Sequence, residues 1–172
     1  PADGGAPAAA DDAPVLRTPQ TMTLTDVEAH LALPATETRA CSLMELVAPR
    51  ARAPQWLVSS CGAEIFAHFV ACLEQFVEDK GLPEDTVFWV SAFALRHHTA
   101  DEEAAAPLEA SPFSRAFCLV DGVISVIDKD GSYFTRPTCL YEVYQTLTAG
   151  PVGLEHHVYT LQEGKEAHPY AP

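Results

Sequence analysis

The residues of this chain that could do metal chemistry include two adjacent histidine pairs, His97-His98 and His156-His157. Imidazole is the commonest metal ligand in proteins. Adjacent residues on a strand point to opposite faces, however, so each pair offers only one histidine to any one site. We therefore interpret both pairs as exposed histidines and predict no metal site.

The five cysteines are the candidate nucleophiles of the chain. Their number is odd and no two form a C-x-x-C pair, so a zinc knuckle and a thioredoxin-type motif are excluded. Cys61 and Cys139 could act as nucleophiles if a neighbouring histidine lowered the pKa of the thiol. No local motif supports this, and buried structural thiols in a reducing intracellular compartment are the expectation.

Composition excludes several classes of partner and ligand. The chain has 172 residues, with 10 Lys and Arg against 24 Asp and Glu, which gives a net charge of −14. Such a charge repels phosphate backbones and anionic lipid, so no nucleic-acid binding is expected. No apolar run approaches the roughly 18 residues of a spanning helix, so no transmembrane segment is predicted. The absence of G-x-G-x-x-G and P-loop motifs argues against a Rossmann dehydrogenase or a nucleoside triphosphatase.

The elements that must position any site form an α/β pattern in one domain, residues 21–172, after a flexible Ala- and Pro-rich arm, residues 1–20. A first helix is expected with Thr25 as its cap and Glu28 as the capping-box partner. Strands are predicted at 55–60, 86–93, 122–128 and 156–161, and the intervening helices at 63–80, 111–119 and 136–148.

This alternation implies a parallel sheet covered by helices on both faces, with any ligand at the carboxyl ends of the strands. The near-continuous apolar run 122–128 is expected to be central, between the strands at 56–60 and 87–93. The last helix is expected to bury Leu140, Val143, Tyr144 and Leu147.

Six ordered blocks resemble a known family. They are CSLMELVA (41–48), LVSSCGAE (57–64), FWVSAFALRHH (88–98), SPFSRAF (111–117), GVISVID (122–128) and RPTCLYE (136–142). Together they are similar to a TIR-like (Toll/interleukin receptor-like) family abundant in algal and other protist proteins. Cys139 and Glu142 stand at the Cys and Glu of the TIR W-C-x-x-E motif, and Thr138 replaces the Trp.

The resemblance implies a flavodoxin-like fold and two alternative functions. Some TIR domains cleave NAD with the helix glutamate, which would make Glu142 catalytic and place the NAD-binding residues at Ser60, Cys61, Gly62 and Thr138. Many others only associate with further proteins. The alternative for Glu142 is a helix residue that pairs with Arg136 or faces solvent.

The site motifs of the family are altered here, whereas the apolar blocks are intact. The family's tryptophans are missing around Ser60 and Cys61, and Ser60, Cys61 and Thr138 are too small to clamp a nicotinamide. We therefore expect at most a shallow cleft and no cofactor. The function favoured is a non-catalytic interaction domain, an adaptor or accessory subunit of a larger assembly, with self-association left open. If Pro1 is a processed terminus, a plastid and its photosynthetic complexes are one setting.

Overall fold

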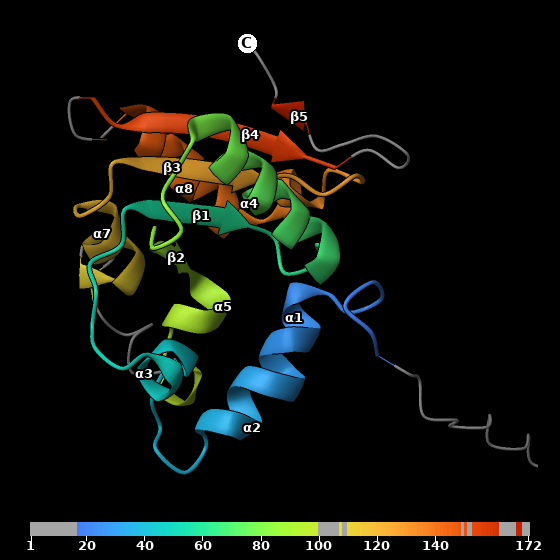
Figure 1. Cartoon of the computed structure of the whole chain (residues 1–172), viewed down its shortest axis with the longest axis vertical. Helices are drawn as coiled ribbons and strands as arrows, with labels where there is room; N and C mark the ends of the chain where they lie inside the picture. The colour runs from blue at the N-terminus through green and yellow to red at the C-terminus, as the bar shows by residue number, and fades with distance from the viewer. Residues whose placement is uncertain are drawn as a thin grey trace, which may run out of the picture.

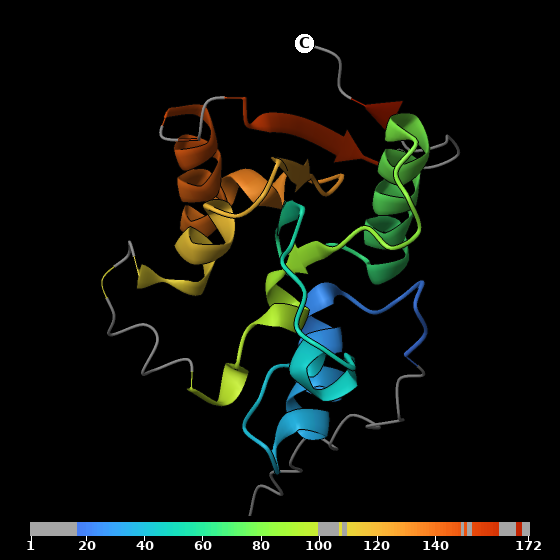
Figure 2. The same ribbon diagram turned by 60° about the vertical axis from the view of Figure 1, so that its left-hand side comes forward.

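The computed structural model describes residues 17–99, 107, 110–148, 150, 153–161 and 168–169. They form an α/β fold in which one five-stranded sheet carries helices on both faces (Figure 1 and Figure 2). Residues 1–16 of the predicted arm lie outside the described residues. In chain order the elements are α1 (Leu24–Val27), η1 (Glu28–Ala32), α2 (Leu33–Thr36), α3 (Leu43–Val47), β1 (Trp56–Ser60), α4 (Phe66–Lys80), β2 (Phe88–Val90), α5 (Ser91–Ala94), η2 (His97–Thr99), α7 (Pro112–Phe117), β3 (Gly122–Val126), η4 (Ser132–Thr135), α8 (Pro137–Thr148), β4 (Glu155–Thr160) and β5 (His168–Pro169).

The strand order is β2-β1-β3-β4-β5, with β1 to β4 parallel and β5 antiparallel to β4. The order 2-1-3-4 is that of flavodoxin-like folds, so the predicted fold class is confirmed. Strand β3 is central and buried along its whole length, as its apolar run predicts. The prediction of its neighbours was wrong in one respect. β3 lies between β1 and β4, because β2 pairs with the other edge of β1.

Strand β2 is shorter than the sequence predicts, because the chain turns into helix α5 at Ser91. Ala92 and Ala94 favour a helix over the extended conformation predicted for residues 91–93. Strand β5 was not predicted at all. It has two residues, too few for any alternating pattern to show.

Helix α4 covers one face of the sheet, as predicted (Figure 2). Phe69, Cys72 and Phe76 recur at helical spacing and are all buried against the strands. The ring of Phe76 lies 4.7 Å from that of Trp56 in an edge-on arrangement, which aromatic pairs prefer. Gly81 ends the helix with φ of 61°, a left-handed conformation that glycine adopts at little cost.

Helices α7 and α8 cover the opposite face. Helix α7 begins as predicted, with the Ser111 hydroxyl accepting a hydrogen bond from the Ser114 N–H and with a proline in its first turn.

Helix α8 faces the sheet with a different side from the one predicted. Of the four residues expected to be buried, only Val143, which is half-buried, packs against the core. Leu140, Tyr144 and Leu147 are 47%, 61% and 69% exposed, whereas Cys139 and Thr146 are buried. The reason is that α8 lies over the carboxyl-terminal halves of β1 and β3. These halves offer serine hydroxyls to it rather than apolar side chains.

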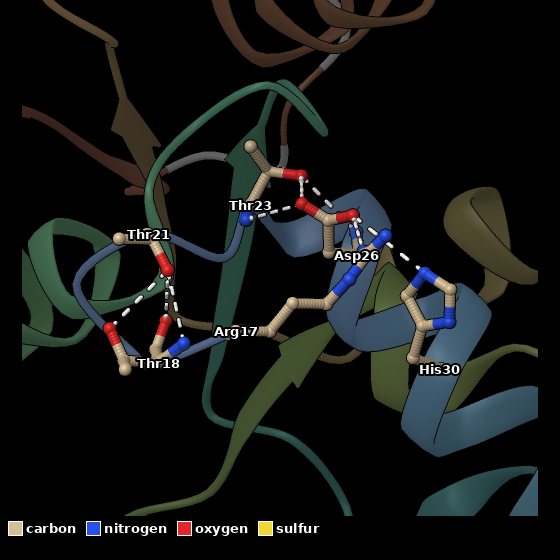
Figure 3. Close-up of polar contacts among 6 residues, drawn as sticks. All are labelled: Arg17, Thr18, Thr21, Thr23, Asp26 and His30. Atoms are coloured by element: carbon tan, nitrogen blue, oxygen red, sulfur yellow. Dashed lines mark hydrogen bonds and ion pairs between the residues drawn. The ribbon is translucent and has the colours of Figure 1, made fainter. Parts of the chain in front are cut away.

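The N-terminal helices lie beyond the β2 edge of the sheet (Figure 1). Helix α1 continues without a break through η1 into α2. Its cap is Thr23, not the predicted Thr25. The Thr23 hydroxyl accepts from the Asp26 N–H at 3.1 Å, and the Asp26 carboxylate accepts from the Thr23 N–H at 3.0 Å (Figure 3). Arg17 pairs with the same carboxylate, so the box also anchors the chain that enters the helix.

All five cysteines are free thiols, and Cys61, Cys72 and Cys139 are buried, whereas Cys118 is exposed. Among the described residues, no helix has both the length and the apolar character needed to cross a bilayer.

Candidate functional site

A cavity of about 400 Å³ opens at the carboxyl ends of β1 and β2. Its lining includes Ser60 at the end of β1 and Gly62 just after it, together with Glu142 and Thr138 of α8. Helices α1, α5 and α7 supply further lining residues, as do η1, β2 and η2. The strand ends meet here because the strands are parallel, so the cavity lies where the topology predicts a site.

Glu142 reaches the edge of this cavity from the inner face of α8. Its carboxylate accepts a hydrogen bond from the Ser59 hydroxyl at 2.5 Å. Burial raises the pKa of Glu142 to about 7, and the Ser59 hydrogen bond opposes that rise only in part. The two non-catalytic placements suggested for Glu142 by the sequence, exposure to solvent and pairing with Arg136, were both wrong. The Glu142 carboxylate does not face open solvent, and it bonds Ser59 rather than Arg136.

Two of the predicted NAD-binding residues, Ser60 and Thr138, line the cavity beside Glu142. Gly62 lines it as well, but a Cβ atom at this position would lie 2.2 Å from the Thr25 hydroxyl oxygen. The close approach of α1 therefore explains this glycine without any ligand. The Thr25 N–H donates to the Gly62 carbonyl at 2.9 Å, which fixes α1 over the end of β1.

Cys61, the remaining predicted residue, is buried beneath the cavity and is not among its lining residues. Its thiol donates to the Asp128 carboxylate at 3.2 Å. Burial and the adjacent Asp128 raise the pKa of the Cys61 thiol to about 12. Burial likewise raises the pKa of Cys139 to about 11. Both thiols are therefore protonated at neutral pH, as expected of structural rather than nucleophilic cysteines.

The aromatic surface that the sequence analysis missed comes from Trp89 and Phe113. Both line the cavity, and their rings lie 6.5 Å apart in an edge-on arrangement. Trp89 also packs against the apolar cluster beneath α7. Its neighbours Phe88 and Val90 do pack on the α4 side, so period-two alternation was the signal that placed Trp89 on the other face.

Two basic side chains at the cavity lie beside carboxylates. The His97 imidazole lies 3.1 Å from the Glu28 carboxylate, and Arg96 pairs with Glu45. His97 and His98 lie on η2 rather than on a strand, and only His98 is exposed, so the predicted reason for their divergence was wrong. They do diverge, since His98 contacts the Thr36 hydroxyl instead. Among the described residues, no group of three His, Cys, Asp or Glu side chains could hold a metal ion.

Comparison of the chain with protein-family models, with curated proteins and with solved structures finds no match.

Proposed function

We propose that this protein is a non-catalytic interaction domain, an adaptor or accessory subunit, that docks on its partner through the outer face of α8. The observation that carries the proposal is the exposed row Leu140, Tyr144 and Leu147. These residues recur at spacings of four and three, so they form one stripe along the helix. Burying a large apolar side chain stabilises a complex by about 1.5–3 kcal/mol.

The charge distribution supports a partner of a different kind from the chain itself. Glu142 is the one ionisable carboxylate of α8, and it points inward to Ser59. The outer stripe is thus uncharged within a chain of net charge −14. Two copies, each with a net charge of −14, would repel each other, so we infer a partner with an apolar groove and basic residues at its rim. Given the resemblance to an algal family, the assembly we propose is a plastid complex, with a photosynthetic membrane complex as the first candidate.

Site-specific photo-crosslinking tests this proposal. A photoreactive residue at position 144 is expected to capture one defined partner in an extract of the native source. The same residue at the exposed position 78 of α4, on the far side of the sheet, is the matched control. Leu147→Ser should abolish capture at 144. Equal capture at both positions, or none at 144, would overturn the proposal, and a product of twice the chain mass would replace the partner by a second copy.

A second candidate function, cleavage of NAD, is favoured by one observation. Glu142 presents a carboxyl group at a cavity whose wall carries Trp89 and Phe113. The bond from ribose to nicotinamide would break, and an anionic Glu142 would stabilise the positive charge that develops on the ribose. Water would then add to the ribose, giving ADP-ribose, nicotinamide and a proton. In this role Ser60 and Thr138 would contact the nicotinamide riboside end.

Nicotinamide release separates the two candidates. The interaction proposal expects none from the wild-type protein at millimolar NAD. The second candidate requires release that Glu142→Gln abolishes and that Glu28→Gln, a change at another carboxylate of the cavity, leaves largely intact. Because the pKa of Glu142 is raised to about 7, the rate would also increase as pH rises through 7.

A further inference from the structure

A continuous chain of hydrogen bonds runs beneath α8 from Glu142 to His156. The Glu142 carboxyl group lies 2.5 Å from the Ser59 hydroxyl, which lies 2.7 Å from the Tyr133 hydroxyl. The Tyr133 hydroxyl lies 3.0 Å from that of Ser125, and the Ser125 hydroxyl lies 3.0 Å from Nε2 of His156. All four distances are within the range of good hydrogen bonds.

Five separate elements contribute to this chain: α8, β1, η4, β3 and β4. Its three middle residues, Ser59, Tyr133 and Ser125, are each at most 1% exposed. Pairing of β1 with β3 aligns Ser59 with Ser125. Pairing of β3 with β4 sets His156 opposite Val123, two residues before Ser125 and on the same face of the sheet. This row of hydrogen bonds is therefore built into the sheet and does not depend on surface side chains.

Each hydroxyl in the chain carries one hydrogen and also accepts one, so all the bonds must point the same way. When Glu142 is protonated, it donates to Ser59, and the row ends with Ser125 donating to His156 Nε2. When Glu142 is ionised, Ser59 donates to it, and the row must begin with His156 donating from Nε2–H. The two directions require different tautomers of the imidazole.

We propose that the Ser59–Tyr133–Ser125 row is a proton relay that makes the tautomer of His156 follow the protonation of Glu142. In the relay step, the Glu142 proton passes to Ser59 as each hydroxyl gives its own hydrogen to the next oxygen. His156 Nε2 takes the last proton, and the imidazolium then releases the proton on Nδ1 to water. One proton leaves Glu142, one enters solvent, and every hydroxyl ends with one hydrogen. His156 is thus a positioning residue for Glu142, and this role is independent of both proposed functions.

The groups around the two ends fit this assignment. Around Glu142 the ionisable neighbours are Tyr133 and Cys139 within the fold and Glu28, Arg96, His97 and Arg136 on the cavity wall. Around His156 the titratable neighbour is His157, and burial together with this neighbour lowers the pKa of His156. The lowered pKa of His156 favours its neutral form in the pH range where Glu142, whose pKa is about 7, changes its charge.

Nitrogen-15 NMR of labelled histidine tests the relay in the full chain. In the wild-type protein, His156 Nε2 is expected to change from an unprotonated to a protonated nitrogen signal as pH rises through about 7. In Tyr133→Phe, which removes only the hydroxyl, that change should vanish. Ser125→Ala breaks a different link and should have the same effect. Tyr159→Phe is the control, because the Tyr159 hydroxyl bonds Asp79 and lies outside the relay.

Two results would overturn the relay. One is a wild-type His156 with a fixed tautomer from pH 6 to pH 9. The other is a tautomer change that persists at the same midpoint in both Tyr133→Phe and Ser125→Ala. Folding of each variant is checked by the dispersion of its amide spectrum. If one relay variant fails to fold, the other decides the result. Glu142→Gln, which cannot ionise, should also hold His156 in one tautomer.

Discussion

The two faces of the sheet are built from alternate residues of the same strands, yet they differ in chemistry. The face under α4 is a dry core in which Trp56, Phe76 and Tyr159 pack against Ile124 and Val126. The face under α7 and α8 is apolar only in its amino-terminal half, where Leu57 and Val123 meet α7. Its carboxyl-terminal half carries Ser59 and Ser125 beneath α8.

This difference shows how one fold can hold both stability and a polar site. Apolar burial needs only matched volume, so the α4 face can be filled by any close-packed set of hydrophobic side chains. The α8 face must satisfy every buried hydroxyl and carboxyl group with a partner, and it does so through one connected row. The polar side of α8 therefore faces inward, which leaves its apolar side to solvent or to a partner.

The largest expected effect is on the α4 face. Phe76→Ala should lower the free energy of unfolding by about 3–5 kcal/mol, because the ring is fully buried and the cavity left behind cannot collapse. Urea denaturation measures the change. Phe134→Ala is the matched control, since that ring is 55% exposed, and it should cost less than about 0.5 kcal/mol. A loss under 1 kcal/mol for Phe76→Ala would show that the α4 face is not the main core.

The second effect is a pH dependence that belongs to the α8 face. The pKa of Glu142 rises from 4.5 in the unfolded chain to about 7 in the fold. Between these values the unfolded state releases its proton first, so stability falls as pH rises from about 4.5 to 7 and stays low above. The full effect is about 3 kcal/mol. Glu142→Gln should therefore be the more stable protein at pH 8 and should lose its advantage at pH 4.5.

Two other groups, Glu64 and His156, also contribute to the pH dependence of stability near this range, and their contributions must be separated from that of Glu142. Burial also raises the pKa of Glu64 to about 7, so Glu64→Gln should flatten the profile in the same direction. The lowered pKa of His156 acts the opposite way, because stability is lost as pH falls below 6.5. Urea midpoints at pH 4.5, 6 and 8 for wild type and both variants separate these contributions. Parallel profiles for wild type and Glu142→Gln would refute the desolvation of Glu142.

The third effect is smaller and tests the connected row. Ser59→Ala leaves the Glu142 carboxyl group and the Tyr133 hydroxyl short of one partner each, which should cost about 1–3 kcal/mol. Ser60→Ala is the neighbouring control. It keeps the carbonyl that the Cys139 thiol contacts, and it should change the free energy of unfolding by less than about 0.5 kcal/mol. Equal effects of the two substitutions in urea denaturation would contradict a special role for Ser59.

The smallest effect is expected on the outer side of α8. Leu147→Ser should change the stability of the isolated protein by less than about 0.5 kcal/mol, because the side chain is already 69% exposed. Thermal unfolding of the isolated chain checks this. A loss above 1.5 kcal/mol would mean that Leu147 belongs to the core of the domain, and the docking surface would then have to be sought elsewhere.

The sequence by itself determined the α/β class, the buried central strand and the inner face of α4. Each of these depends on a local period or an unbroken apolar run, which a single segment displays without its neighbours. It also marked Glu142 through the resemblance, and it marked the strand ends where the cavity lies. Trp89 was within reach of the same reasoning, since it alternates with Phe88 and Val90, but its place in the cavity wall was not inferred.

Only the tertiary structure decided the order of the strands, the direction in which α8 faces and the burial of Glu142. A helix with apolar residues on one side and Cys139, Glu142 and Thr146 on the other can be placed either way from its own sequence. The orientation of α8 depends on the strand residues that lie beneath it. Ser59 and Ser125 come from strands far apart in the chain. Their hydroxyls form hydrogen bonds with polar side chains, which leucine side chains cannot do. That contact exists only once β1 and β3 are paired.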